Sequence, residues 1–137
     1  LSATRAAARR PGEGQDTICH ANRYSTPELQ AVEVPGDALF TDRAVAALRG
    51  TRVHASSDAR HAALAAALAR GAGPLDGAAL QALFSDHGAA GEGSDDTICR
   101  HGPYWQTDAM VQLFPRQRRM RVAFDAPCRA RPAELAL

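Results

Sequence analysis

Asn22 has the chemistry and the position expected of a group that stabilises an oxyanion. It is the only asparagine of the chain, and it follows a short β-branched and apolar run at residues 17–20. Its side-chain NH2 can donate a hydrogen bond without carrying charge, so it could stabilise an oxyanion that forms during a reaction. The alternative interpretation is an asparagine that only tolerates a left-handed turn.

Arg100 is the second candidate for chemistry. It follows Ile98 and Cys99 in a segment of strand-like composition, with His101 directly after it. A permanent cation there would lower the pKa of a nearby thiol or hold a substrate carboxylate through the planar guanidinium. The alternative is a structural ion pair with Asp86 or Asp96.

The three cysteines are Cys19, Cys99 and Cys128. Cys19 and Cys99 each follow an isoleucine, which favours packed thiols over reactive groups, and Cys128 is interpreted as structural. A metal site is an alternative that would draw on these cysteines together with His20 and His101. Because no Cys-x-x-Cys or His-x-x-x-His pair occurs, every ligand pair would have to be assembled by the fold, so we expect no metal and no cofactor.

An ordered series of short motifs resembles one enzyme family. Residues 83–87 read Leu-Phe-Ser-Asp-His, residues 98–101 read Ile-Cys-Arg-His, and residues 125–128 read Asp-Ala-Pro-Cys. Residues 20–24, His-Ala-Asn-Arg-Tyr, are similar to a His-Thr-Asn-His-Phe element, with Ala21 and Arg23 as the two departures. In this order the motifs resemble the C-terminal half of the acyl-coenzyme A:6-aminopenicillanic acid acyltransferase family, over about residues 18–128.

The resemblance implies a four-layer αββα N-terminal nucleophile hydrolase fold and an autoprocessed cysteine nucleophile. It implies cleavage of an acyl-amino bond, amide or thioester, through an acyl-cysteine, with an acyl-amino or acyl-coenzyme A compound as substrate. The catalytic residues would be Asn22 and Arg100, supported by His20, Asp86, His87 and His101. The nucleophile would come from a preceding segment, the expected partner of this chain, so these 137 residues alone are expected to be inactive. A non-catalytic remnant or interaction module is the alternative.

The composition argues against nucleic-acid-binding, membrane and secreted proteins. The formal net charge is +1, with sixteen arginines and no lysine against fifteen acidic residues, which gives no general field for nucleic acid or a membrane surface. No apolar run approaches the length of a membrane span. Three cysteines are too few for a secreted disulfide framework, so a reducing compartment, the cytoplasm, is expected.

The pattern of elements that must position these residues predicts an α+β fold. We expect a poorly specified lead-in at residues 1–15, followed by one domain portion at residues 16–137. Strands are predicted near residues 16–20 and 96–100. Helices are predicted over residues 59–70, capped by residues 56–58, and from Asp76 to about His87, where Asp86 and His87 would form a cap and a buried hydrogen-bonding pair.

The clearest local prediction is an antiparallel hairpin of residues 105–114 and 120–124. Met110, Gln112 and Phe114 alternate with Val111 and Leu113, which indicates a strand with two distinct faces. Residues 115–119 are polar and begin with proline, as expected of a solvated turn. A short terminal strand is predicted at residues 134–137.

Overall fold

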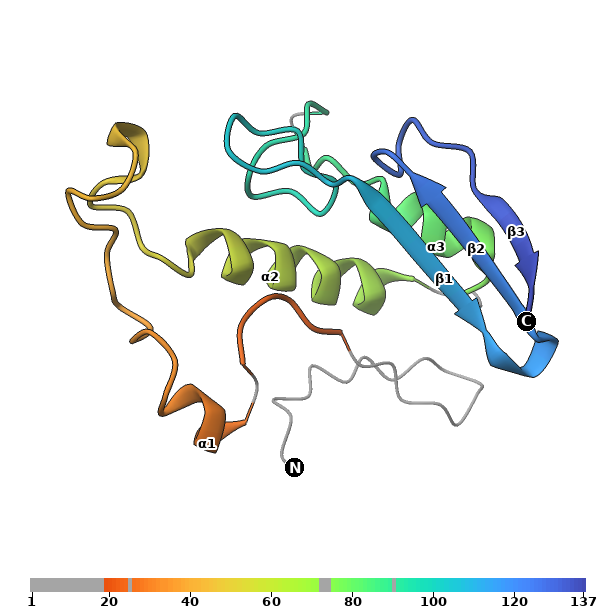
Figure 1. The fold of residues 1–137 in the computed structure, drawn as a ribbon, viewed down its shortest axis with the longest axis horizontal. Coiled ribbons are helices and arrows are strands. Elements are labelled where there is room, and N and C mark those ends of the chain that lie inside the picture. The colour runs from red at the N-terminus through yellow and green to blue at the C-terminus, as the bar shows by residue number, and fades with distance from the viewer. Residues whose placement is uncertain (1–18, 25, 72–74, 90) are drawn as a thin grey trace. The chain divides into compact units, whose positions relative to one another are not determined.

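The computed structural model describes residues 19–24, 26–71, 75–89 and 91–137, and its elements form an α+β fold (Figure 1). The chain divides into two compact units, Leu1–Gly71 and Ala72–Leu137. The predicted lead-in at residues 1–15 lies outside the described residues. No helix in the described part of the chain is both long and apolar enough to cross a membrane.

The first unit is organised around helix α2, Ala55–Arg70, which follows the short helix α1, Pro27–Gln30, and the 3-10 turn η1, Ala46–Leu48. The high alanine, leucine and arginine content of α2 explains its helical state. The predicted cap at residues 56–58 is wrong, because the helix begins one turn earlier and His54 occupies the cap position. Asp58 instead lies in the first turn, where a carboxylate is stabilised by the positive end of the helix dipole.

The second unit consists of helix α3, Gly77–Phe84, and a sheet in the order β1 (Ala109–Phe114), β2 (Arg119–Phe124) and β3 (Ala133–Ala136). Asp76 caps α3 as predicted, since its carboxylate accepts a hydrogen bond from the Ala79 N–H at 2.8 Å. The helix ends at Phe84 rather than near His87. Asp86 and His87 therefore lie in the loop beyond the helix.

The predicted hairpin is confirmed. Strands β1 and β2 pair antiparallel with Val111 opposite Val122, and the 3-10 turn η2, Pro115–Gln117, joins them. Arg118 closes the turn in the left-handed region, at φ 48°. The terminal strand β3 pairs antiparallel with β2, which places Leu135 opposite Met120.

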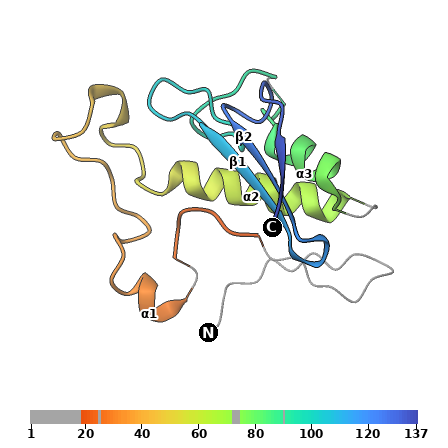
Figure 2. The same ribbon diagram turned by 45° about the vertical axis from the view of Figure 1, so that its right-hand side comes forward.

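The two faces of this sheet differ in character. Helix α3 covers one face (Figures 1 and 2), where Met110, Gln112 and Ala123 are buried. Residues directly opposite each other in a sheet point to the same side, so the register defines the second face as well. We call this second face the open face; its members are all apolar: Ala109, Val111, Leu113, Met120, Val122, Phe124, Ala133 and Leu135.

The strands predicted near residues 16–20 and 96–100 are not found in the described residues of these segments. Cys19 and His20 belong to no strand, and residues 16–18 lie outside the described residues. Residues 96–100 form bends and turns, and His101 makes only an isolated bridge to Gln106. Hydrogen bonds from side chains hold this loop instead: the Thr107 hydroxyl accepts from the Arg100 N–H at 3.0 Å. The first part of the predicted hairpin strand, residues 105–108, also lies outside β1.

Candidate functional site

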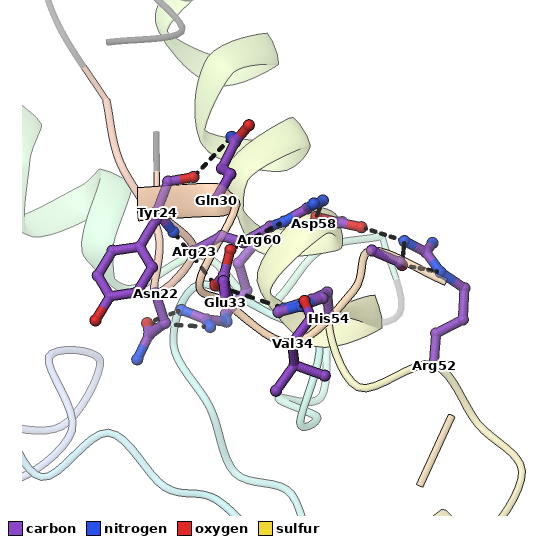
Figure 3. Close-up of polar contacts among 11 residues, drawn as sticks. Asn22, Arg23, Tyr24, Gln30, Glu33, Val34, Arg52, His54, Asp58 and Arg60 are labelled. Carbon is purple, nitrogen blue, oxygen red and sulfur yellow. Dashed lines mark hydrogen bonds and ion pairs between the residues drawn. The ribbon is translucent and has the colours of Figure 1, made fainter. Parts of the chain in front are cut away.

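Asn22 is held by an arginine of helix α2. Its side-chain Oδ1 accepts hydrogen bonds from Nη1 and Nη2 of Arg60 at 3.3 and 3.2 Å (Figure 3). A guanidinium only donates hydrogen bonds, so the amide must present its oxygen to Arg60. The NH2 group consequently points away from Arg60, and the side chain is exposed (Figure 3).

A pocket of about 190 Å³ lies beside Asn22 in the first unit. Both chain neighbours of Asn22 line it, together with residues of the loop before α1, of the end of α1 and of α2: Cys19, His20, Tyr24, Gln30, Ser57, Asp58 and His61. Cys19 is buried at 6% exposure, and its Sγ lies 3.6 Å from Nε2 of His61. The pocket thus combines a thiol, two imidazoles and the phenol of Tyr24.

Ion pairs fix the loop that carries Asn22 against α2 (Figure 3). Asp58 accepts from Arg23 at 3.3 Å and from Arg52 at 2.7 Å. On the other side, Glu33 lies 3.8 Å from Arg23 and 4.0 Å from Nδ1 of buried His54. Arg23, one of the two departures from the motif that residues 20–24 resemble, is therefore one of the structural links between the loop and the helix.

Arg100 lies in the second unit, in the loop between α3 and β1. Its guanidinium carbon is 5.9 Å from the centre of the Trp105 ring, a cation–π contact. Among the described residues it forms no ion pair, so the expected alternative of a structural pair with Asp86 or Asp96 is not found. A half-buried arginine without a carboxylate partner retains its capacity to hold an anion.

Asn22 and Arg100 belong to different units, and the structure describes each unit by itself. Their convergence on one pocket stays a prediction. The same holds for His20, which lines the pocket of the first unit, in relation to Asp86, His87 and His101 of the second.

Four potential metal ligands gather at the end of α3 in the second unit: His87, Cys99, His101 and Cys128, whose ligand atoms all lie within 4.8 Å of one another. Nε2 of His101 lies 3.5 Å from Sγ of Cys99 and 3.1 Å from Sγ of Cys128. Burial raises the pKa of the Cys99 thiol. Burial also lowers the pKa of His101, and the neighbouring guanidinium of Arg129 lowers it further.

Asp86 and His87 do not form the predicted cap, because Ser85 caps α3, and each of them contacts a backbone group of the following loop rather than the other. Oδ1 of Asp86 accepts from the Gly88 N–H at 2.9 Å, and Nδ1 of His87 lies 3.3 Å from the Gly91 carbonyl oxygen. Both residues are half-buried. The hydrogen bonds from Arg60 to Asn22 and the contact of His61 with Cys19 were not predicted. Nothing in the sequence of the alanine-rich helix α2 distinguishes Arg60 and His61 from its other polar residues.

Comparison of the chain with protein-family models, with curated proteins and with solved structures finds no match.

Proposed function

We propose that this chain is the C-terminal part of a cysteine acyltransferase or amidohydrolase that acts on acyl-amino bonds, amide or thioester, in a reducing compartment such as the cytoplasm. An N-terminal cysteine on a preceding segment attacks the acyl carbonyl, and the acyl group passes to water or to an amine. Asn22 donates to the oxyanion and Arg100 holds an anionic group of the substrate or lowers the pKa of the thiol. His20, Asp86, His87 and His101 have supporting roles.

The orientation of the Asn22 amide is the observation that carries this proposal. Arg60 occupies the oxygen of the amide and leaves the NH2 exposed, and the two chain neighbours of Asn22, Ala21 and Arg23, line the pocket. A donor used for oxyanion stabilisation must be oriented before the reaction, because reorganisation during the reaction would raise the barrier. The motif series of the sequence supports the same assignment.

The open face of the sheet supports the layered αββα architecture. Val111, Leu113 and Phe124 are 54%, 60% and 85% exposed, although the opposite face is buried against α3. A sheet in a two-layer protein turns polar residues to solvent, whereas each of the two inner sheets of an αββα fold has apolar residues on both faces, one face against helices and the other against the second sheet. We therefore assign the open face to contact with a second sheet of the complete protein.

Acyl-enzyme trapping tests the proposed function. The complete protein, with its preceding segment, is incubated with a series of acyl-amino acid amides and acyl-coenzyme A thioesters and is quenched before intact mass is measured. We expect an adduct of the mass of the acyl group on the N-terminal cysteine, and none when that cysteine is replaced by alanine. The isolated chain should form no adduct. Turnover by the isolated chain, or a complete protein that never forms an adduct, would contradict the proposal and favour a non-catalytic module.

Leu113→Arg tests the assignment of the open face. In the isolated chain we expect weaker binding of a hydrophobic dye and an almost unchanged free energy of unfolding, within about 0.5 kcal/mol, because the side chain is already solvated. In the complete protein the same change should cost about 3 kcal/mol or more, because it buries an unpaired charge between two sheets. Gln106→Arg, at another exposed position, is the matched control. Equal tolerance of both substitutions in the complete protein would show that the face is not covered.

A further inference from the structure

The cluster at the end of α3 has the dimensions of a tetrahedral metal centre. With Zn–S bonds of about 2.3 Å and Zn–N bonds of about 2.0–2.1 Å, neighbouring sulfur and nitrogen ligands lie about 3.5 Å apart. The two distances from Nε2 of His101, 3.5 Å to Cys99 and 3.1 Å to Cys128, are close to that value. A small contraction of the remaining pairs, now within 4.8 Å, would complete the tetrahedron.

His87 points to a missing ligand. Its Nε2 is buried and has no hydrogen-bond partner among the described residues. Its Nδ1 faces the Gly91 carbonyl at 3.3 Å, which fixes the tautomer with the proton on Nδ1 and the lone pair on Nε2. Metal-ligating histidines characteristically donate their second ring N–H to a backbone carbonyl in this way. A buried lone pair without a donor is otherwise costly.

The backbone holds these ligands without help from regular strands. The Cys99 N–H donates to the Asp86 carbonyl at 3.0 Å, which ties the loop of Cys99 and His101 to the segment of His87. The turn after β2 presents Cys128 through a hydrogen bond from the Arg129 N–H to the Ala126 carbonyl at 2.9 Å. Gly93 packs so closely on His101 that a Cβ there would collide with the imidazole ring.

We propose that His87, Cys99, His101 and Cys128 form a structural zinc site in the second unit. Two thiolates and two neutral imidazoles are the ligand set that Zn²⁺ prefers over harder cations. On binding, both thiols release their protons to solvent, so the two thiolates balance the charge of the ion. Four protein ligands leave no open position, which makes the site structural rather than catalytic. Arg100 lies between two ligands in the chain, so zinc would fix the loop that carries it.

Arg129 is the group that opposes binding. Its Nη2 lies 3.2 Å from Nδ1 of His101 and 3.8 Å from Oδ1 of Asp125. When Nε2 of His101 binds zinc, Nδ1 carries a proton, and two donors then face each other. The exposed Arg129 side chain must turn toward Asp125. Arg129→Gln removes the charge and offers an amide oxygen to the Nδ1–H, so it is expected to tighten zinc binding severalfold.

Metal titration of the reduced, metal-free chain tests the site. We expect one zinc ion per chain in competition with a chromophoric chelator, a higher melting temperature with zinc, and, with Co²⁺ as probe, the d–d and sulfur charge-transfer bands of a tetrahedral thiolate site. The site does not depend on the proposed acyl transfer, and none of these measurements uses activity. The same titration on the complete protein should give the same stoichiometry.

Variants of two proposed ligands, with a cysteine outside the cluster as control, make the test specific. Cys128→Ser and His87→Gln should each weaken zinc binding by about 100-fold or more, since losing a ligand exceeds the 10–100-fold effect of losing a group that only orients one. Cys128 is exposed, so its replacement is expected to leave the metal-free fold intact. Cys19→Ser, in the other unit, should leave zinc affinity unchanged. Zinc bound without change in these variants, no tetrahedral Co²⁺ spectrum, or a Cys99–Cys128 disulfide in the freshly purified chain would overturn the proposal.

Discussion

For the proposed acyl transfer, Asn22→Asp is expected to reduce kcat of the complete protein by about 10²–10³-fold, the effect of removing one oxyanion donor. Aspartate has nearly the shape of asparagine and can keep the two contacts with Arg60, now as an ion pair, so the loop should remain in place. What changes is the exposed group: the NH2 becomes a carboxylate oxygen, which repels the oxyanion. Steady-state kinetics should show the loss in kcat, with KM and the melting temperature close to those of the parent.

A substitution of Arg60 tests whether the orientation of the Asn22 amide matters for kcat. Because it orients the amide and does not itself face the pocket, Arg60→Met should lower kcat by a smaller factor, about tenfold, the order of one hydrogen bond to a charged group. In the Asn22→Asp background the Arg60 substitution should add little to the loss in kcat, since no donor is left to orient. Unchanged kcat in Asn22→Asp would remove Asn22 from the proposed catalytic residues.

The parts of the fold that sequence analysis predicted correctly are those decided by neighbouring residues. The alternation around Val111 and the proline at the turn were enough to predict the β1–β2 hairpin, and Asp76 with its hydrogen bond to Ala79 marked the start of α3. Such signals are local, because strand faces repeat every two residues and a cap contacts a group three residues away.

The loop before β1 was misread for the opposite reason. Ile98 and Cys99 have the composition of a buried strand, yet the chain there follows contacts with Thr107 and with the end of α3. Tertiary contacts routinely override the propensity of so short a segment. Propensity therefore carried no information about how Cys99 would be presented.

Candidate site residues were predicted by type better than by grouping. The sequence identifies Cys99, His101 and Cys128 as potential metal ligands, but it pairs them with Cys19 and His20 and does not include His87. The absence of closely spaced ligand pairs argues against a metal site. The structure groups the first three with His87, although 27 residues separate His101 from Cys128. Ligand spacing is diagnostic only where a short loop holds both ligands; here hydrogen bonds between distant loops do so.

Gly102→Ala is expected to destabilise the second unit by about 2–3 kcal/mol, through overpacking that no side-chain movement can relieve. Gly102 is buried, and a Cβ at this position would overlap the carboxylate of Asp95 and lie 2.6 Å from its backbone nitrogen. The Asp95 carboxylate accepts a hydrogen bond from the Trp105 N–H at 3.0 Å, so displacing the carboxylate would also break this hydrogen bond. Thermal unfolding with a chelator present should show a melting temperature lower by roughly 10–20 °C for a unit of this size.

Gly91→Ala separates packing from backbone strain. Gly91 has a φ of 73°, and beyond its chain neighbours no atom of the described residues lies within 4 Å of the position where a Cβ would stand. Alanine there therefore meets the cost of a left-handed conformation, about 1 kcal/mol. Gly102, by contrast, has an ordinary φ, and its cost comes from the collision with Asp95 alone. If Gly91→Ala proved the more damaging of the two, the close contact between Gly102 and Asp95 would not exist in solution, and the loop that carries Arg100 would have to be positioned by other contacts.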